Sequence, residues 1–461
     1  MQLDKKELPG SEREEELESV SVPEEEKKPF LPEPVEETDR RGDAGEKKRF
    51  RLPRKETPAQ DDPVLPEETS GEAPRRPVNR RLIGRLVLVG AALLLALFIG
   101  LMFLFPELFN LDRFVRFFRY MGLRNKAGYG VINYETGADN VYYAFDGCLA
   151  VGSESGLTLY DLEGKQKAMV QGTLSDPLVS CGDKICAIYS PGTSYLAAFG
   201  KGGKILLDQT VTGTILDLDV SNDGYLCYLG SESGYKSTAT LYSPKQELQF
   251  RLTSRTRYLN ACAVSDGGKY LAVASLGEEE SVFCSEITIL RTRDRLDDLD
   301  SEDSTAVRVN LGSQVIYDLE FLSGGTLCAV GQNDVTFLSP EGKIYRQISL
   351  EKNPLVGYDF SSKGFVVLLQ RIGMAGENYR LTTLDGSGEE LGLLDLEEKV
   401  RDVSACGRYV AVLKEGKAVI YRRNLKKYAS TSEVGTATRI VARPDGTALL
   451  VSGTQAVLYI P

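Results

Sequence analysis

Short stretches of alternating hydrophobic and polar residues follow one another from residue 140 to the end of the chain. Each stretch ends at a turn that contains glycine, as in LDVSNDG (218–224) and VARPDG (441–446), and a more continuously apolar stretch follows. Alternation with a period of two is typical of a half-buried β-strand, and a short apolar run between turns is typical of a buried one. The pattern predicts an all-β domain over residues 127–461.

These strands recur in units of four. The first strand of each unit begins near one of eight positions: 140, 177, 214, 258, 315, 354, 399 and 437. A period of about 40–45 residues with four strands per unit is typical of a β-propeller. We therefore predict an eight-bladed β-propeller, with a seven-bladed ring as the alternative.

The last unit contains only three strands. Residues 128–135, which precede the first unit, alternate in the same way and are expected to supply the missing outer strand. A blade built from both ends of the domain closes the ring and leaves no sheet edge free.

The turns carry a family resemblance. Ser221-Asn222-Asp223-Gly224, Ser265-Asp266-Gly267 and Arg443-Pro444-Asp445-Gly446 are similar to the Ser-Pro-Asp-Gly-like turn of WD40-like and YVTN-type propellers. Taken whole, the chain resembles an uncharacterised family of single-span, membrane-anchored bacterial β-propeller proteins. The resemblance implies a propeller fold and no known activity.

A second pattern precedes the propeller. Residues 86–105 form a run of twenty apolar and small residues without a charge. A helix of this length spans about 30 Å, which matches the hydrocarbon core of a bilayer. We predict one transmembrane helix within residues 82–105, which would make the lipid bilayer a partner of the chain.

Residues 1–80 are rich in proline, glutamate and lysine and almost without aromatic residues, so they are expected to form a disordered acidic tail. Both flanks of the apolar run are basic. The arginines before it are the more concentrated: Arg75, Arg76, Arg80, Arg81 and Arg85. The positive-inside rule then predicts a single-pass protein of the cell membrane with a cytoplasmic tail and an extracytoplasmic propeller.

Residues 107–122 have the pattern of a short amphipathic helix. Phe114, Phe117, Phe118 and Met121 share an apolar side, and the arginines that include Arg116 lie three or four residues apart on the other. Such a helix either lies in the membrane interface or packs under the propeller, and the sequence leaves both interpretations open.

Composition excludes several function classes. The chain has no histidine and no tryptophan and a formal net charge of −11. Without histidine, catalytic triads and the usual zinc sites lack a base or a ligand. An acidic propeller is also a poor partner for nucleic acid. We predict no cofactor, no metal site and no catalytic residue.

Eight cysteines lie in the propeller region. Cys227 and Cys328 occupy equivalent places in different units, so they are too far apart to pair, and most of the thiols are expected to be small buried residues. Only Cys181 and Cys186, on either side of one turn, could form a disulfide.

One set of acids recurs at the same place in four units, five residues before the turn glycine: Asp219, Glu320, Asp359 and Asp402. On the innermost strands they would surround one mouth of the central channel. They predict either a site for a cation or a polyol, or carboxylates that each accept hydrogen bonds from a neighbouring blade.

A second acidic cluster lies in the long insertion of the fourth unit, residues 291–304. Its acids are Asp294, Asp297, Asp298, Asp300, Glu302 and Asp303. We expect this loop on the same face of the ring as the channel acids, as a binding site for a basic partner or a divalent ion, or as a solvated, mobile loop. Arg251, Arg255 and Arg257 are expected on the opposite face.

Two functions remain from the sequence. The first is a non-catalytic scaffold or sensor that binds a protein or a cell-envelope polymer on one propeller face. The second is a carbohydrate-active enzyme with paired carboxylates at the channel mouth, since that chemistry needs no histidine.

Overall fold

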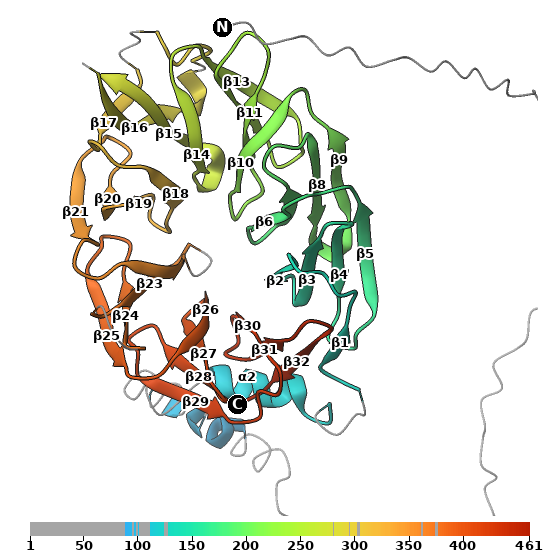
Figure 1. Ribbon diagram of the computed structural model, residues 1–461. Helices are drawn as coiled ribbons and strands as arrows, with labels where there is room; N and C mark the ends of the chain where they lie inside the picture. The colour runs from blue at the N-terminus through green and yellow to red at the C-terminus, as the bar shows by residue number, and fades with distance from the viewer. Residues whose placement is uncertain are drawn as a thin grey trace, which may run out of the picture. The chain divides into compact units, whose positions relative to one another are not determined.

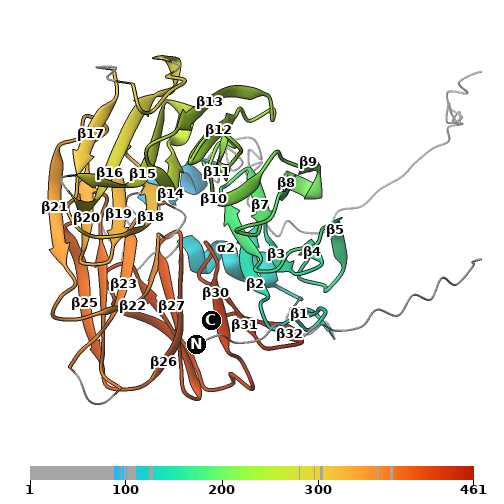
Figure 2. The same cartoon turned by 45° about the horizontal axis from the view of Figure 1, so that its top comes forward.

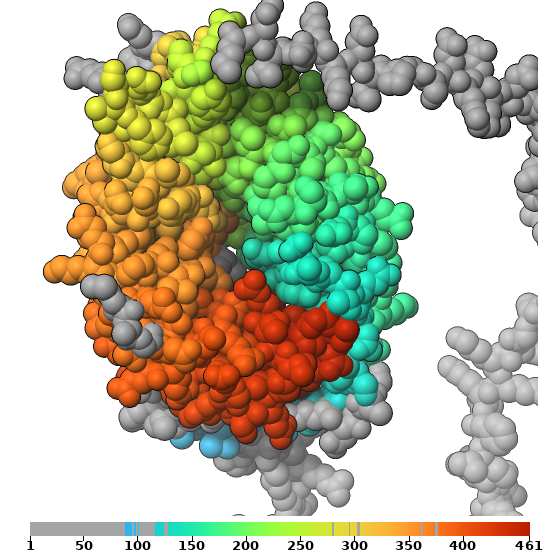
Figure 3. Space-filling view, viewed as in Figure 1, coloured from blue at the N-terminus to red at the C-terminus, as the bar shows by residue number. Residues whose placement is uncertain are grey.

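The computed structural model describes residues 88–94, 96–97, 100, 111–123, 128–279, 281–294, 296–301, 305–360, 363–373 and 377–461. Within them, eight four-stranded antiparallel sheets surround a central channel (Figures 1 and 2). The space-filling view shows this channel as a narrow opening at the centre of the ring (Figure 3). The predicted eight-bladed all-β propeller is confirmed.

The blades are numbered in chain order, and their strands run from the channel outward. Blade 1 consists of β2 (Val141–Phe145), β3 (Cys148–Ser153), β4 (Gly156–Tyr160) and β5 (Gln166–Gln171). Blade 2 consists of β6 (Leu178–Cys181), β7 (Ile185–Tyr189), β8 (Tyr195–Gly200) and β9 (Ile205–Thr210). Blade 3 consists of β10 (Thr214–Val220), β11 (Leu226–Ser231), β12 (Ser237–Tyr242) and β13 (Leu248–Ser254). Blade 4 consists of β14 (Tyr258–Val264), β15 (Tyr270–Glu279), β16 (Val282–Arg291) and β17 (Val307–Asn310).

The second half repeats this order. Blade 5 consists of β18 (Ile316–Phe321), β19 (Leu327–Gly331), β20 (Asp334–Leu338) and β21 (Ile344–Ser349). Blade 6 consists of β22 (Leu355–Asp359), β23 (Val366–Arg371), β24 (Tyr379–Leu384) and β25 (Glu390–Leu396). Blade 7 consists of β26 (Val400–Cys406), β27 (Tyr409–Lys414), β28 (Lys417–Arg422) and β29 (Lys427–Thr431). Blade 8 consists of β30 (Arg439–Ala442), β31 (Ala448–Val451), β32 (Gln455–Tyr459) and β1 (Val131–Asn133).

Blade 8 closes the ring. β1 pairs antiparallel with β32, with Val131 opposite Val457 and Asn133 opposite Gln455. The outer strand of the last blade therefore comes from the segment before the first blade, as the sequence predicts. This pairing covers an edge of β32 that would otherwise expose unpaired backbone groups.

The hydrophobic core lies between neighbouring blades. One cluster, for example, joins Leu157 and Leu159 of blade 1 to Ile188 and Phe199 of blade 2, and all four are at most 1% exposed. Both faces of each sheet are covered in this way, which explains why the second and third strands of a blade read as continuous apolar runs.

The ring has two faces, which we name by the loops they carry. The turn face carries the turns from first to second strand, such as residues 221–225 between β10 and β11. The connection face carries the links between blades, such as residues 255–257 between β13 and β14. Because strands alternate in direction, each inner strand runs from the connection face to the turn face.

Helix α2 (Leu111–Tyr120) packs against blade 8 (Figure 1). Its polar side faces the ring: Arg116 is 4% and Tyr120 3% exposed, whereas Phe117 and Met121 are 62% and 60% exposed. The sequence predicted a helix here but not that an arginine would be buried. Burial is possible because the Arg116 guanidinium donates to the Asp445 carbonyl at 3.0 Å.

The predicted transmembrane helix and tail fall mainly outside the described residues. Residues 88–94 are helical, and the rest of the apolar run is described only in part. Among the described residues, no helix is long and apolar enough to cross a membrane. The span, the tail of residues 1–80 and the predicted orientation stay predictions.

The structure joins Cys181 to Cys186 in a disulfide across the β6–β7 hairpin, where the two residues are directly paired. Cys227, Cys262, Cys284 and Cys328 form no disulfide and are buried. These thiols pack as small apolar side chains, in line with the sequence prediction.

Candidate functional site

Acids on the inner strands bind the next blade. Asp217 and Asp219 of β10 each accept a hydrogen bond at 2.8 Å, from the backbone N–H of Cys262 and of Val264 on β14. An inner strand has no sheet neighbour on its channel side, so its N–H groups there need other acceptors. The aspartates supply them and tie blade 3 to blade 4.

The same link recurs around the ring. Asp359 accepts from the Ala405 N–H at 2.8 Å, and Asp402 accepts from the Ile440 N–H at 2.7 Å. Asp219, Asp359 and Asp402, three of the four predicted site acids, therefore hold neighbouring blades together. This arrangement matches the second interpretation of the acids, as acceptors for backbone groups of a neighbouring blade.

Two serines make the equivalent link with a hydroxyl group. Ser180 accepts from the Val220 N–H at 3.3 Å, and Ser404 accepts from the Ala442 N–H at 3.1 Å. Neither serine was predicted from the sequence, because the recurring pattern there consists of carboxylates and these links use a hydroxyl.

Glu320 has a different partner. Its Oε1 lies 2.6 Å from the Nζ of Lys363, which also lies 3.5 Å from Oδ1 of Asp219. Lys363 is in the β22–β23 turn of blade 6, is only 3% exposed and has a φ of 67°. One ammonium group therefore joins blades 3, 5 and 6 at the turn-face end of the channel.

Lys363 occupies the place where the sequence predicts a cation. The four predicted acids do not converge: Asp219 and Glu320 meet at this ammonium, while Asp359 and Asp402 each bind their own neighbour. Within the described residues, no group of three or more His, Cys, Asp or Glu side chains could hold a metal ion.

The cluster around Lys363 contains more acid than base. Asp217, Asp219, Asp318 and Glu320 lie close enough to influence one another's ionisation. Burial raises the pKa of Glu320, and the nearby Lys363 ammonium opposes that rise. Burial and the charge of Asp217 raise the pKa of Asp318 to about 7, against a hydrogen bond from the Tyr358 hydroxyl. Burial is the main cause that raises the pKa of each of these four carboxyl groups.

The connection-face end of the channel is built differently. Five consecutive inner strands, β10 to β26, skip one residue in their pairing close to their first residues. The skipped residues are Leu216, Asn260, Tyr317, Val356 and Arg401. Such bulges redirect a side chain out of the regular alternation. Tyr317 and Val356 are 56% and 55% exposed there.

Aromatic and basic side chains continue this rim at blades 3 and 4. Tyr258, the first residue of β14, is 56% exposed, and the Lys236 Nζ lies 4.8 Å from the centre of its ring. The Arg255 guanidinium lies 5.3 Å from the centre of the Tyr235 ring. We call these four residues together with Tyr317 and Val356 the basic-aromatic rim.

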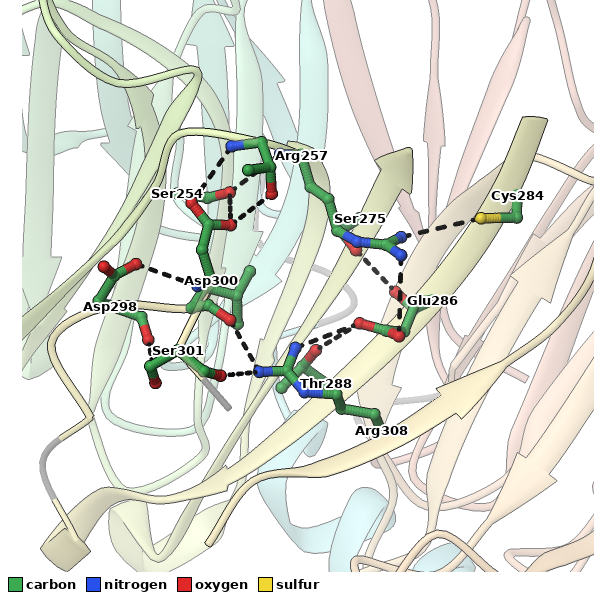
Figure 4. A network of polar contacts seen from close by, with 12 residues as sticks. Ser254, Arg257, Ser275, Cys284, Glu286, Thr288, Asp298, Asp300, Ser301 and Arg308 are labelled. Atoms are coloured by element: carbon green, nitrogen blue, oxygen red, sulfur yellow. Dashed lines mark hydrogen bonds and ion pairs between the residues drawn. The ribbon is translucent and has the colours of Figure 1, made fainter. Parts of the chain in front are cut away.

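The acidic insertion of blade 4 supports this rim. Asp300 accepts hydrogen bonds from the Ser254 and Thr256 hydroxyls and from the N–H groups of Arg255 and Thr256, at 2.6–3.2 Å (Figure 4). Burial raises the pKa of Asp300, but these hydrogen bonds outweigh burial and lower it. The Asp300 carboxylate therefore fixes the link that carries Arg255 and precedes Tyr258.

Apolar contacts determine where this insertion lies. Leu296 and Leu299 are 8% and 0% exposed and belong to the core cluster between blades 3 and 4, so the loop folds along β13. Its backbone pairs with Thr253, and Arg308 binds the Leu299 and Ser301 carbonyls (Figure 4). The loop thus reaches the connection face, whereas we expected it to stay on the turn face.

The other loop acids that the structure describes have separate partners. Asp294 pairs with Arg293, the Asp297 carbonyl accepts from Thr253, and Asp298 accepts from the Asp300 N–H. Glu302 and Asp303 lie outside the described residues.

Several solved propellers are similar to this chain in fold. An apo AztD structure from Citrobacter koseri is 13% identical, with a TM-score of 0.43, over 66% of this chain and 88% of that one. The C-terminal WD40 domain of Sif2 is 12% identical, with a TM-score of 0.45, over 72% and 97%. Chaetomium thermophilum Sqt1, bound to the N-terminus of ribosomal protein L10, is 11% identical, with a TM-score of 0.46, over 72% and 100%.

Function does not follow from these likenesses, and no functionally curated protein matches the chain. A sequence family does match. It covers residues 123–454, which is nearly the whole propeller and well over half of the chain, and it is described as "Family of unknown function (DUF5711)". The chain belongs to this family.

Proposed function

We propose that this protein is a non-catalytic binding scaffold whose basic-aromatic rim takes a protein partner on the connection face. The observation that carries the proposal is the exposure of Tyr258, Tyr317 and Val356, each more than half exposed, at one end of a rigid ring. Exposed aromatic side chains on a fixed frame bind at little cost in conformational entropy.

The chemistry of the rim favours an acidic or aromatic polypeptide segment. Lys236 and Arg255 already lie over tyrosine rings, so a partner carboxylate would meet a cation and an aromatic face together. Asp300 holds Arg255 and Thr256 in place, so less of the rim has to become ordered when a partner binds.

The turn-face acids favour a structural role over catalysis. Asp219 and Glu320 share the ammonium of Lys363, and their side chains are 9% and 12% exposed. A pair of carboxylates that hydrolyses glycosides needs open space between them for a sugar and a water. Here a lysine occupies that space, so we do not favour the carbohydrate-active alternative.

We further propose that the ring is tethered to the cell membrane by residues 86–105, with the tail in the cytoplasm and the propeller outside it. Described helical residues of this run expose apolar side chains: Leu88 is 72%, Leu93 66% and Leu94 68% exposed. Such side chains are stable in contact with lipid rather than water.

Site-specific photo-crosslinking in intact cells tests the rim. A photo-reactive residue at position 317 should capture a discrete, protease-sensitive partner, and Arg255→Glu should reduce that capture. The matched control is position 345, where Tyr345 is 49% exposed on the outer strand β21. The same species captured equally at both positions, or capture unaffected by Arg255→Glu, would overturn the proposal. A protease-resistant product would indicate an envelope polymer instead.

A further inference from the structure

We infer that helix α2 lies on the surface of an anionic bilayer. The turn face of the propeller is then directed toward the lipid, and the basic-aromatic rim faces away from it. This inference rests on the membrane tether proposed above. Beyond the tether, the ring then has a defined orientation relative to the membrane, and the bilayer contacts the exposed side of α2.

The first step is that α2 is fixed to the ring. Arg116 donates to the Asp445 carbonyl at 3.0 Å and to the Tyr428 hydroxyl at 2.5 Å. The Tyr120 hydroxyl donates to the Asp445 carboxylate at 2.8 Å and accepts from Arg443 at 3.2 Å. Hydrogen bonds that involve charged groups are the stronger kind, so the helix and blade 8 form one body.

The second step is that these contacts lie on the turn face. Asp445 and Arg443 belong to the turn between β30 and β31, the counterpart of the β10–β11 turn. Arg443 also donates to the carbonyl of Gly147, in the corresponding turn of blade 1, at 2.9 Å. The helix therefore lies against blades 7 and 8 on the turn face, the face that also carries Lys363.

The third step is the side of α2 that faces away from the ring. Phe117 and Met121 are 62% and 60% exposed. The Arg119 side chain beside them is 56% exposed, and its guanidinium lies 3.2 Å from the Asp445 carboxylate of the ring. Exposed apolar side chains next to a half-exposed cation suit the boundary between acyl chains and anionic headgroups.

The segment between the apolar run and α2 is short. Five residues, 106–110, separate the end of the apolar run at Phe105 from the first residue of α2. Even fully extended, this link spans only about 20 Å. If residues 86–105 cross a bilayer, α2 must lie near its surface, and the orientation of α2 fixes the orientation of the ring.

The absence of tryptophan from the chain gives a direct test. Phe117→Trp and Tyr317→Trp each create a full-length protein with a single tryptophan, on α2 and on the rim respectively, which can be excited selectively at wavelengths that tyrosine does not absorb. Both proteins are reconstituted in vesicles of phosphatidylcholine and phosphatidylserine, with and without brominated acyl chains. Bromine should quench Phe117→Trp by about twofold or more and leave Tyr317→Trp unchanged.

The outcomes separate the two proposals. If the protein floats with vesicles and neither tryptophan is quenched, the tether holds and the orientation is wrong. Quenching of Tyr317→Trp reverses the orientation. Failure to float with vesicles overturns both. Met121→Trp serves as a second probe on the same side of α2, and circular dichroism confirms that each variant is folded.

Discussion

The two ends of the channel show how one repeated strand can serve opposite purposes. At the turn face, Asp219 and Glu320 lie near the ends of their inner strands, where they pair with a backbone N–H group and with Lys363. At the connection face, the first residues of the same strands skip a pairing position and expose Tyr317 and Val356. The turn-face end holds the blades together, whereas the connection-face end leaves side chains exposed.

The largest expected effect on stability comes from removing the Lys363 ammonium at the turn-face end of the channel. Lys363→Met leaves Asp219 and Glu320 buried without their cation, so we expect a loss of about 3–5 kcal/mol in the free energy of unfolding. Urea denaturation followed by circular dichroism measures it. Lys343→Met, at an exposed lysine of blade 5, is the matched control and should change little. Equal effects of the two substitutions would show that Lys363 is not a structural link.

The protonation of Asp318 should make stability depend on pH. Its pKa is about 7 in the folded protein, above the usual value of an unfolded aspartate. The folded state then binds more protons between about pH 4 and 7, so stability falls as pH rises through this window, by up to about 4 kcal/mol. Above pH 7 both states are ionised and this dependence ends.

Asp318→Asn is the variant that isolates this effect. An asparagine keeps the shape and can still accept from Tyr358, but it does not titrate. The unfolding free energy of the variant, measured from pH 4 to 7, should lack the decline seen in the natural protein. An unchanged decline would assign it to other acids of the cluster.

A smaller effect on stability is expected from Asp300, which supports the basic-aromatic rim at the connection face. Asp300→Ala removes four hydrogen bonds from the link between β13 and β14 and should cost about 1–3 kcal/mol. Because the pKa of Asp300 is lowered on folding, its contribution is present at neutral pH and is lost as pH falls through that lowered pKa. Asp297→Ala, in the same loop, is the control, because its contact with Thr253 is made by the backbone carbonyl, which the substitution keeps.

The smallest effect on stability should come from the rim itself. Tyr317→Ser removes an exposed side chain, so the unfolding free energy should change by less than about 0.5 kcal/mol. Partner capture from a photo-reactive residue at position 258 should nevertheless fall in this variant. Undiminished capture would move the binding surface away from the rim.

The sequence predicts the fold more completely than the site, for a physical reason. Inner strands begin at Val141, Leu178, Thr214, Tyr258, Ile316, Leu355, Val400 and Arg439, each within two residues of its predicted start. Alternation and turn glycines are local, so they can be read along the chain. They also recur in every blade, so errors at one unit are corrected by the others.

The ion pairs of Lys363 could not be predicted from local patterns. Its partner Asp219 lies 144 residues earlier in the chain, and only the assembled ring brings them together. The side of α2 that packs against the ring was also undetermined. A helical pattern separates Arg116 from Phe117, but it does not say which of them meets Asp445. Long-range partners, rather than local propensity, decide both.

The pairing of β1 with β32 also has a consequence for folding during synthesis. Val131–Asn133 emerge from the ribosome among the first residues of the propeller, yet their sheet partners at 455–457 emerge among the last. During that interval the nascent ring stays open, because blade 8 is incomplete. The strands at both ends of the open ring then have unpaired edges. A chaperone that shields such edges, or translation fast enough to shorten the wait, would raise the yield of closed rings.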